Sequence, residues 1–189
     1  MSQTSVSNMT GRLTQTELRR RFWHMAPGVL PFTLWVIPHQ DPLSPAFSLL
    51  ILAVAVSISA AIFFRYRQIQ RSAADHQQLA AVSGYALSVL FTLWLFPGDA
   101  EIGFTVLTIL AFGDGSATFG GLYFGGPALP WNPRKTWSGF LSFLIMGTAV
   151  ATTAYWGESH NVEAMTPGVT VLTAFACAGA GVLAAALAE

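Results

Sequence analysis

The segment that decides the fold is VTVLTAFACAGAGVLAAALA, residues 169–188. It runs for 20 residues without a Lys, Arg, Asp or Glu. A helix of about 20 mostly apolar residues is what crosses the hydrocarbon core of a bilayer. The segment therefore predicts a membrane-spanning helix. Its many Ala and Gly residues indicate close packing against other helices, because small side chains let helix backbones approach in lipid.

The composition of the whole chain agrees with a membrane protein. Of 189 residues, 53% are hydrophobic and 10% are charged, whereas a soluble domain carries about 25% charged residues. The mean hydropathy is +0.52. The net charge of zero gives no electrostatic basis for binding nucleic acid. The single cysteine, Cys177, lies in an apolar run, and we expect it to be a buried, inert thiol.

Five more apolar segments precede the last one. They are residues 22–37, 45–64, 79–96, 102–112 and 137–156, of which 102–112 extends into a glycine-rich stretch. The fold class predicted is therefore all-α, a polytopic membrane helix bundle with about six transmembrane helices. We expect residues 1–20 to be a flexible polar tail without a secretory signal, and residues 21–189 to form a single transmembrane domain.

The distribution of basic residues predicts the orientation. All nine fall into three groups. These are Arg12, Arg19, Arg20 and Arg21 before the first span, Arg65, Arg67 and Arg71 after the second, and Arg134 and Lys135 after the fourth. With six spans, all three groups lie on one side of the membrane. The positive-inside rule then places both termini and residues 114–135 in the cytoplasm. We expect an integral protein of a bacterial inner membrane or an equivalent membrane.

Asp114 is the first residue with candidate chemistry. It follows the fourth apolar segment in the stretch AFGDGSATFGG, residues 111–121, which we expect to be a connection at the membrane face. A carboxylate there is a functional candidate, because charge at a membrane span is costly. The alternative is an Asp that caps the next helix. Gly113, Gly115 and Gly120 permit close approach of the backbone to a phosphate or to another helix.

The second element is Arg134-Lys135-Thr136. Two adjacent cations can clamp phosphate oxygens, Arg as a bidentate fork and Lys as a point charge. The alternative is a positive-inside anchor. Thr136 can cap the following helix and offer a hydroxyl. These residues are predicted on the same side as Asp114. A glycine-rich P-loop signature, G-x-x-x-x-G-K-[ST], is absent from the sequence.

Arg21 and His24 form the third element, at i, i+3 spacing where the first span begins. Both could reach the same cytoplasmic pocket. The alternatives are a His24 that bonds a backbone carbonyl and an arginine that contacts lipid headgroups. The sequence holds no Cys/His spacing for structural zinc and no serine nucleophile elbow.

Taken together, these motifs resemble the polyprenol, phytol and CTP-dependent diacylglycerol kinases. A related pattern occurs in phosphatidate cytidylyltransferases. The matching residues are Arg21, His24, Gly113, Asp114, Gly120, Gly125, Pro133, Lys135, Thr136 and Gly139. The cytidylyltransferases also carry a metal-binding region that has no counterpart here, which favours the kinases. The kinases usually continue beyond the last span through residues that could include metal ligands, whereas this chain stops at Glu189. Either the chain is truncated or this member lacks those groups.

The resemblance implies a membrane kinase that moves a phosphoryl group from a nucleoside triphosphate, CTP or ATP, to a lipid alcohol. It implies that Asp114 holds Mg²⁺, that Arg134 and Lys135 neutralise phosphate charge, and that His24 is the base, with Asp114 as the other candidate. Thr136, Gly113, Gly115, Gly120 and Arg21 would complete the nucleotide site. Membrane lipids are expected partners, and nucleic acid is not. The alternatives are cytidylyl transfer to phosphatidate and a non-enzymatic membrane protein, and the oligomeric state is open, a homo-oligomer included.

Overall fold

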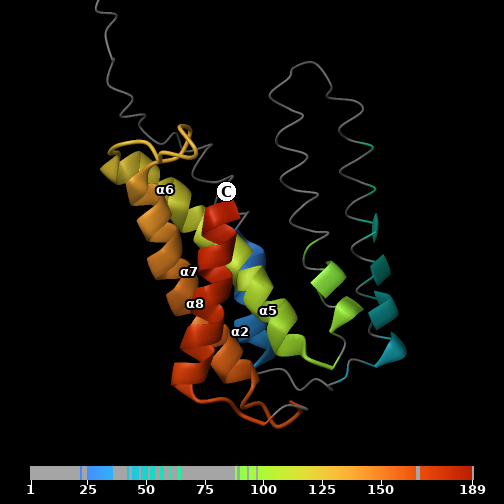
Figure 1. Cartoon of the computed structure of the whole chain (residues 1–189). Helices are drawn as coiled ribbons and strands as arrows, with labels where there is room; N and C mark the ends of the chain where they lie inside the picture. Colours follow the sequence, from blue (N-terminus) through green and yellow to red (C-terminus); the bar gives the residue numbers. More distant parts are fainter. Residues whose placement is uncertain are drawn as a thin grey trace, which may run out of the picture.

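The computed structural model describes the chain in segments. The described residues are 22, 25–35, 42, 44–46, 48–50, 52–53, 56–57, 60, 64, 88, 90–92, 94–96, 98–164 and 167–188. Within them the secondary structure is helical, without a β-strand and with one isolated antiparallel bridge between Ala128 and Thr136 (Figure 1). The predicted all-α class is therefore confirmed for this part of the chain.

Three helices in the described residues are long and apolar enough to cross a membrane. They are Ala100–Phe124, Trp137–Glu158 and Val171–Ala188, each with an 18-residue stretch whose mean hydropathy is 1.4, 1.3 and 2.1 respectively. They correspond to the last three predicted spans. The first three predicted spans fall largely outside the described residues, apart from pieces such as the 3₁₀ turn η1 (Ala26–Val29) and the short helix α2 (Leu30–Leu34). The count of six spans, the orientation of the termini and the 1–20 tail thus stay predictions.

The fourth span is longer than the sequence predicts. Helix α5 (Ala100–Thr108) runs into a π-helical segment, η2 (Ile109–Gly113), and then into α6 (Asp114–Phe124). The glycine-rich stretch is therefore helical, and the expected connection at the membrane face is wrong for residues 111–121. In lipid every backbone group must be satisfied internally. Glycines there serve helix packing, so their low helix propensity does not end the span.

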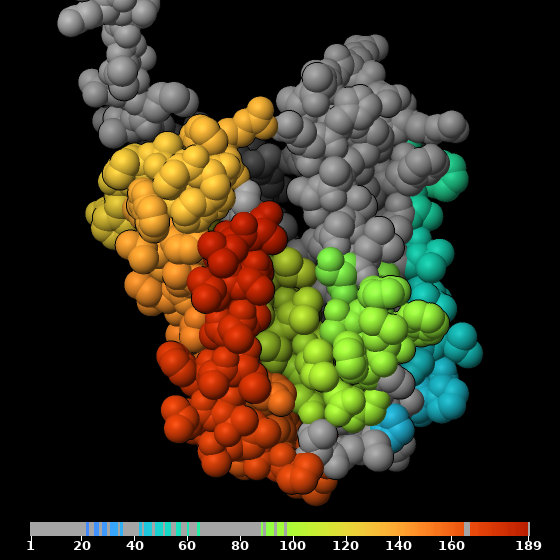
Figure 2. All heavy atoms as spheres, viewed as in Figure 1, coloured from blue at the N-terminus to red at the C-terminus, as the bar shows by residue number. Residues whose placement is uncertain are grey.

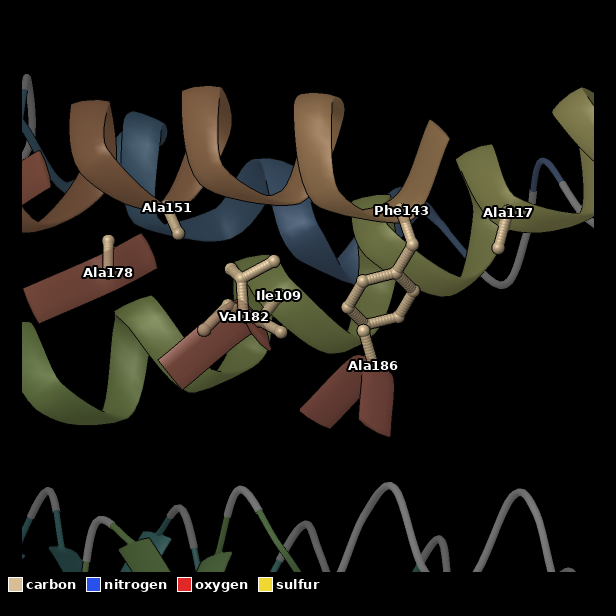
Figure 3. Close-up of a cluster of buried hydrophobic side chains, with 7 residues drawn as sticks. All are labelled: Ile109, Ala117, Phe143, Ala151, Ala178, Val182 and Ala186. Carbon is tan, nitrogen blue, oxygen red and sulfur yellow. The ribbon is translucent and has the colours of Figure 1, made fainter. Parts of the chain in front are cut away.

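Helix α7 (Trp137–Glu158) packs against most of the other described helices. Its neighbours are α6, η2, α5 and α8 (Val171–Ala188) (Figure 1). The buried cluster between them is made mostly of small or branched side chains. Its members are Ile109, Ala117, Phe143, Ala151, Ala178, Val182 and Ala186. Figure 3 shows Phe143 of α7 pointing toward Ala186 of α8, so one large ring fills the space that the alanines leave.

Helix α8 buries a single stripe. Ala174, Ala178, Val182 and Ala186 recur every four residues and are buried, whereas Cys177 is exposed. The expected buried thiol is therefore wrong, because Cys177 falls beside this stripe and not on it. Figure 2 shows α8, in red, on the outer surface of the bundle. The rest of the helix presents an apolar face, as a lipid-facing helix does.

The contact between α6 and α7 depends on glycine. A Cβ atom at Gly139 would lie 2.8 Å from the backbone carbonyl oxygen of Ala117. A Cβ atom at Gly120 would meet Ser142 and, at 3.1 Å, the carbonyl oxygen of Ser138. Because a backbone oxygen in a helix cannot move aside alone, residue 139 must be glycine for the two helices to stay this close.

We expect Gly139→Ala to lower the free energy of unfolding by about 1–3 kcal/mol, the usual range for an overpacked contact. The matched control is Gly181→Ala, since a Cβ atom there would lie 3.7 Å from Ile109, an ordinary contact. That change is expected to be neutral or stabilising, because alanine is the better helix former. Thermal unfolding in detergent, followed by circular dichroism, measures both. Equal stability of the two variants would contradict the close contact.

Candidate functional site

Asp114 lies within a membrane span and not at its end. It is the first residue of α6, ten residues before Phe124. At 1.5 Å of rise per residue, its Cα lies about 15 Å below the end of the helix. Its side chain is half-buried. A carboxylate at such a depth marks a functional site by default, because it must face protein or water instead of lipid.

The backbone around Asp114 excludes the alternative of a capping residue. A cap stands where a helix begins, with free N–H groups ahead of it. Here α6 continues directly from η2, and the backbone N–H of Asp114 donates to the carbonyl of Ala111. The residue before it, Gly113, makes no side-chain cap either. The carboxylate of Asp114 is therefore not explained by helix capping.

The π-helical segment η2 directly precedes Asp114. A π turn accommodates one extra residue and is frequent at functional sites. Two close contacts hold it: Gly28 packs against Ala111 and Phe112, and Gly113 packs against the ring of Phe143. The extra residue rotates everything after it by about 100° relative to an uninterrupted α-helix. The π segment thus sets the direction in which Asp114 leaves the helix.

Hydroxyl groups follow Asp114 along the seam between α6 and α7. The Ser116 hydroxyl donates to the carbonyl of Gly113 at 2.8 Å and to that of Ser142 on α7 at 3.1 Å. The Thr118 hydroxyl donates to the carbonyl of Asp114 at 3.2 Å. These bonds satisfy carbonyls near the π turn, which a regular helix would pair through its backbone. They also make this part of the helix contact polar.

The loop from α6 to α7 is folded back on itself. Gly125 and Gly126 reverse the chain with φ values of 62° and 109°, a region that other residues rarely adopt. Asn132 then begins a β-turn: Lys135 N–H donates to its carbonyl at 3.0 Å and Arg134 N–H to its side-chain oxygen at 3.2 Å. Pro133 is at the second turn position, where proline is favoured. This turn places the two cations at defined positions.

The two cations differ in environment. Arg134 is exposed, whereas Lys135 is half-buried, and Lys135 is tied to the loop because its carbonyl accepts from Leu129 N–H at 2.9 Å. Since a cation partly shielded from water interacts more strongly with an anion, Lys135 is the better placed of the two to hold a phosphate. Figure 1 shows this loop at the same end of the bundle as the last turn of α8.

Thr136 caps helix α7, as the sequence predicts. Its hydroxyl oxygen accepts from Gly139 N–H at 3.2 Å and lies 3.0 Å from the Ser138 hydroxyl. Ser138 in turn donates to the carbonyl of Gly125. Ser138 was not among the candidates from the sequence. The signal was the Thr-x-Ser-Gly order at the start of a span, where a second hydroxyl can reach the preceding loop.

The loop that carries the cations lies beside α6, but Asp114 lies further from the end of that helix than the loop does. A Cβ atom at Gly121 would lie 3.1 Å from the Thr136 hydroxyl oxygen, so the start of α7 stands beside Gly121. Asp114 lies seven residues earlier on the same helix, about 10 Å of rise. A single phosphate does not cover that separation. An extended triphosphate is the kind of ligand that both ends could share.

The three candidate glycines on this helix contact protein. Gly113 faces Phe143, Gly115 faces Met25, and Gly120 faces Ser142. Helix packing is thus sufficient to explain them, and their role beside a phosphate stays a prediction.

The remaining candidates from the sequence are Arg21, His24 and a magnesium site at Asp114. Arg21 and His24 lie outside the described residues. Within the part of the chain that the structure describes, no group of three or more His, Cys, Asp or Glu could hold a metal ion. Asp114 is therefore considered as a single carboxylate ligand.

Two carboxylates are buried at the other end of the bundle. The sequence pattern places both of them in connections between predicted spans. Glu101 in the first turn of α5 and Glu158 at the end of α7 are each 2% exposed. Asn161 donates to Glu158 at 3.0 Å, and Glu101 sits at a helix N-terminus, where negative charge is favoured. Glu158 is therefore tied to the turn that follows α7.

The comparisons with known proteins give a consistent set of relatives. The chain is 28% identical over 154 residues to phytol kinase 1, chloroplastic, of Arabidopsis thaliana, covering 76% of this chain and 50% of that protein. It is 27% identical to a probable chloroplastic phytol kinase of Zea mays, over 72% of this chain and 47% of the relative. The chain thus spans about half the length of the curated relatives it matches. No family model and no solved structure matches.

A third relative matches more of the chain. A probable chloroplastic phytol kinase of Triticum aestivum is 25% identical over 87% of this chain and 59% of its own length. The curated homologues are phytol kinases, which supports the assignment of the chain to the phytol and polyprenol kinase family. The relation to phosphatidate cytidylyltransferases rests on the resemblance of motifs alone.

The cap of α7 can be tested by itself. We expect Thr136→Val to lower the free energy of unfolding by about 1 kcal/mol, because the first turn loses its side-chain acceptor. Thr136→Ser keeps that acceptor and is expected to retain the stability. Thr153→Val is a matched control, since the Thr153 hydroxyl bonds the carbonyl of Ala149 in its own helix. Unfolding in detergent and hydrogen exchange at Gly139 measure the effect. Unchanged exchange in Thr136→Val would count against the cap.

Proposed function

We propose that this chain is an integral membrane lipid kinase. It transfers the terminal phosphoryl group of a nucleoside triphosphate, CTP by resemblance, to the hydroxyl of a lipid alcohol. The names of the curated relatives support a kinase that acts on such an alcohol. The observation that carries the proposal is the half-buried carboxylate of Asp114 inside a candidate membrane span. The loop that follows this span carries two cations.

The depth of Asp114 argues for a function. A charged side chain near the centre of a membrane helix costs about 2.5–3.5 kcal/mol. The π turn and the neighbouring hydroxyls make sense if this carboxylate is aimed at a polar ligand.

Asp114 fits a magnesium ion that arrives with a nucleotide. Mg²⁺ keeps several waters and is usually bound by one or two carboxylates together with phosphate oxygens. No group of three or more such ligands lies among the described residues. When bound, the ion would neutralise charge on the phosphate oxygens. We infer that Asp114 would hold it together with the phosphates.

The loop residues would bind the phosphates. Lys135 would neutralise charge on the transferring group, and the exposed Arg134 is the weaker candidate for the same role. The Thr136 hydroxyl lies at the start of α7, where the helix dipole favours a negative ligand. Gly113, Gly115 and Gly120 keep α6 close to its neighbours, which fixes the distance between Asp114 and the loop.

The transfer step needs a base and an acceptor. His24, or failing it Asp114, would take the proton of the lipid hydroxyl while the new O–P bond forms and the bond to the leaving nucleoside diphosphate breaks. Arg21 would support the same pocket. The acceptor would be phytol, a polyprenol or diacylglycerol, with its chain in the bilayer and its hydroxyl near the loop.

The loop end would face the compartment that supplies nucleotides, the cytoplasm by the count of basic residues. The curated relatives are named as chloroplast proteins, so they offer no support for a bacterial inner membrane. The donor nucleotide, the acceptor lipid and a homo-oligomer all belong to the proposal.

We expect Asp114→Asn and Lys135→Ala each to lower nucleotide-dependent lipid phosphorylation by at least about 100-fold, the usual loss when one charge-stabilising group is removed from a catalytic site. Both variants should still insert and unfold like the parent protein. The assay uses purified protein in detergent, labelled CTP or ATP, and phytol, a polyprenol or diacylglycerol as acceptor.

Asp99→Asn is the matched control. Asp99 precedes α5 at the other end of the same span and makes no side-chain cap, so its loss should leave the rate within about twofold, as for a surface substitution. Full activity in Asp114→Asn or Lys135→Ala would remove that residue from the site.

The reaction products distinguish the kinase hypothesis from the cytidylyltransferase hypothesis. A kinase releases CDP and forms a phosphorylated alcohol, whereas cytidylyl transfer to phosphatidate releases pyrophosphate. We expect CDP from labelled CTP and no pyrophosphate. Pyrophosphate that depends on phosphatidate would overturn the kinase proposal in favour of the cytidylyltransferase.

A further inference from the structure

An aromatic cluster covers the loop end of α7. Trp131 of the loop, Trp137 at the start of α7 and Phe140 one turn later meet edge to face in all three pairs, with ring centroids 5.7–5.8 Å apart. Such edge-to-face pairs are attractive beyond the area that they bury. Phe140 also packs against the buried cluster of the bundle. The three rings therefore form one rigid unit that is attached to the core.

The outer part of this aromatic cluster is exposed. Trp131 is 47% exposed and Trp137 is 38% exposed, and at the end of α6 Tyr123 and Phe124 are more exposed still. Figure 2 shows this end of the bundle, in yellow, on the surface. Exposed aromatic side chains gathered at one place mark an interaction site. The charged residues of the α6–α7 loop indicate which kind of partner this site would bind.

The charges of the α6–α7 loop are of one sign. Between Asp114 and Glu158 the sequence holds Arg134 and Lys135 and no carboxylate. Arg134 is exposed in the turn that directly follows Trp131. Indole rings with adjacent cations suit the boundary of a bilayer, where the rings lie among the upper acyl chains and the cations meet headgroup phosphates. The two cations of the loop add complementarity to a negative surface.

We propose that the aromatic cluster of Trp131, Trp137 and Phe140, with the exposed Arg134, docks the α6–α7 loop onto anionic phospholipid of the surrounding membrane. The loop would then lie at the interface instead of projecting into water, which fixes the height of Lys135 and Thr136 above the bilayer. The proposal concerns the membrane and does not depend on the kinase reaction.

A spin label in the loop tests this docking. The full chain with Cys177→Ala and Ala128→Cys carries a nitroxide at residue 128, which is exposed in the loop. The reference position is Val162→Cys, which is 98% exposed beyond the other end of α7. Both proteins are reconstituted in vesicles of phosphatidylcholine with or without phosphatidylglycerol. Collision with oxygen reports lipid, and collision with a water-soluble nickel complex reports water.

We expect the label at residue 128 to collide with oxygen far more than the label at residue 162 does. Without phosphatidylglycerol its accessibility to the nickel complex should rise about fivefold, the loss of one surface attraction of about 1 kcal/mol. Trp131→Ala should raise that accessibility as well, and Trp131→Phe should raise it less. Trp156→Ala removes a tryptophan at the other end of α7 and should have no effect.

Three results would overturn the proposal. The label at residue 128 could be as accessible to the nickel complex as the label at residue 162 in every vesicle. Its accessibility could be the same with and without phosphatidylglycerol, which would show that anionic lipid is not the partner. Spin–spin broadening between labels at residue 128 would show that a second copy of the chain covers the rings. None of the variants changes Asp114 or Lys135, so failure here is distinct from failure of the proposed kinase activity.

Discussion

The contact between the Cα of Gly139 and the backbone of Ala117 is the constraint on which the rest of the described bundle depends. It sets the separation of α6 and α7, because a Cβ atom at residue 139 would lie 2.8 Å from a carbonyl oxygen. Lipid gives helices no hydrophobic reason to associate, so close van der Waals packing has to hold them together. That close packing also brings Ser142 to Ser116 and Thr136 to Gly121. The residues that could bind a ligand are therefore positioned by the same contact that holds the fold.

The π-helical segment η2 determines which face of the span Asp114 occupies. A carboxylate in a membrane helix has to avoid lipid, yet the face of a helical residue is fixed by its position in the sequence. One extra residue in η2 changes that face for everything after it. Gly28 and Gly113 make room for the wider turn, and the Ser116 hydroxyl satisfies the carbonyl of Gly113. The backbone irregularity and its stabilising contacts thus lie directly before Asp114.

Sequence patterns predicted the helical class and the last two spans correctly, since a long uncharged run such as residues 169–188 is typical of a membrane-spanning helix. They also reached the Thr136 cap, whose signal is local. They failed for residues 111–121, because glycine permits a loop and a close helix contact equally well. Only the partner helix decides between the two. The π turn has no local signature, and Cys177 was misplaced because an all-apolar run does not reveal which stripe is buried. The roles of Asp114 and Lys135 depend on a ligand, so neither pattern nor packing decides them.

The surroundings of Asp114 favour one direction of approach for a polar ligand. Toward the start of the span the helix is lined by buried apolar residues, among them Phe104, Leu107 and Ile109, and it closes with the buried Glu101. Toward the loop the seam between α6 and α7 carries the hydroxyls of Ser116, Ser142 and Ser138 and ends at Thr136. A phosphate chain would lose its hydration in the first direction without compensation, whereas the loop end of the span carries two cations. The half-buried carboxylate of Asp114 and the cations of the loop therefore make sense together, since such a carboxylate is useful only if a charged ligand can reach it.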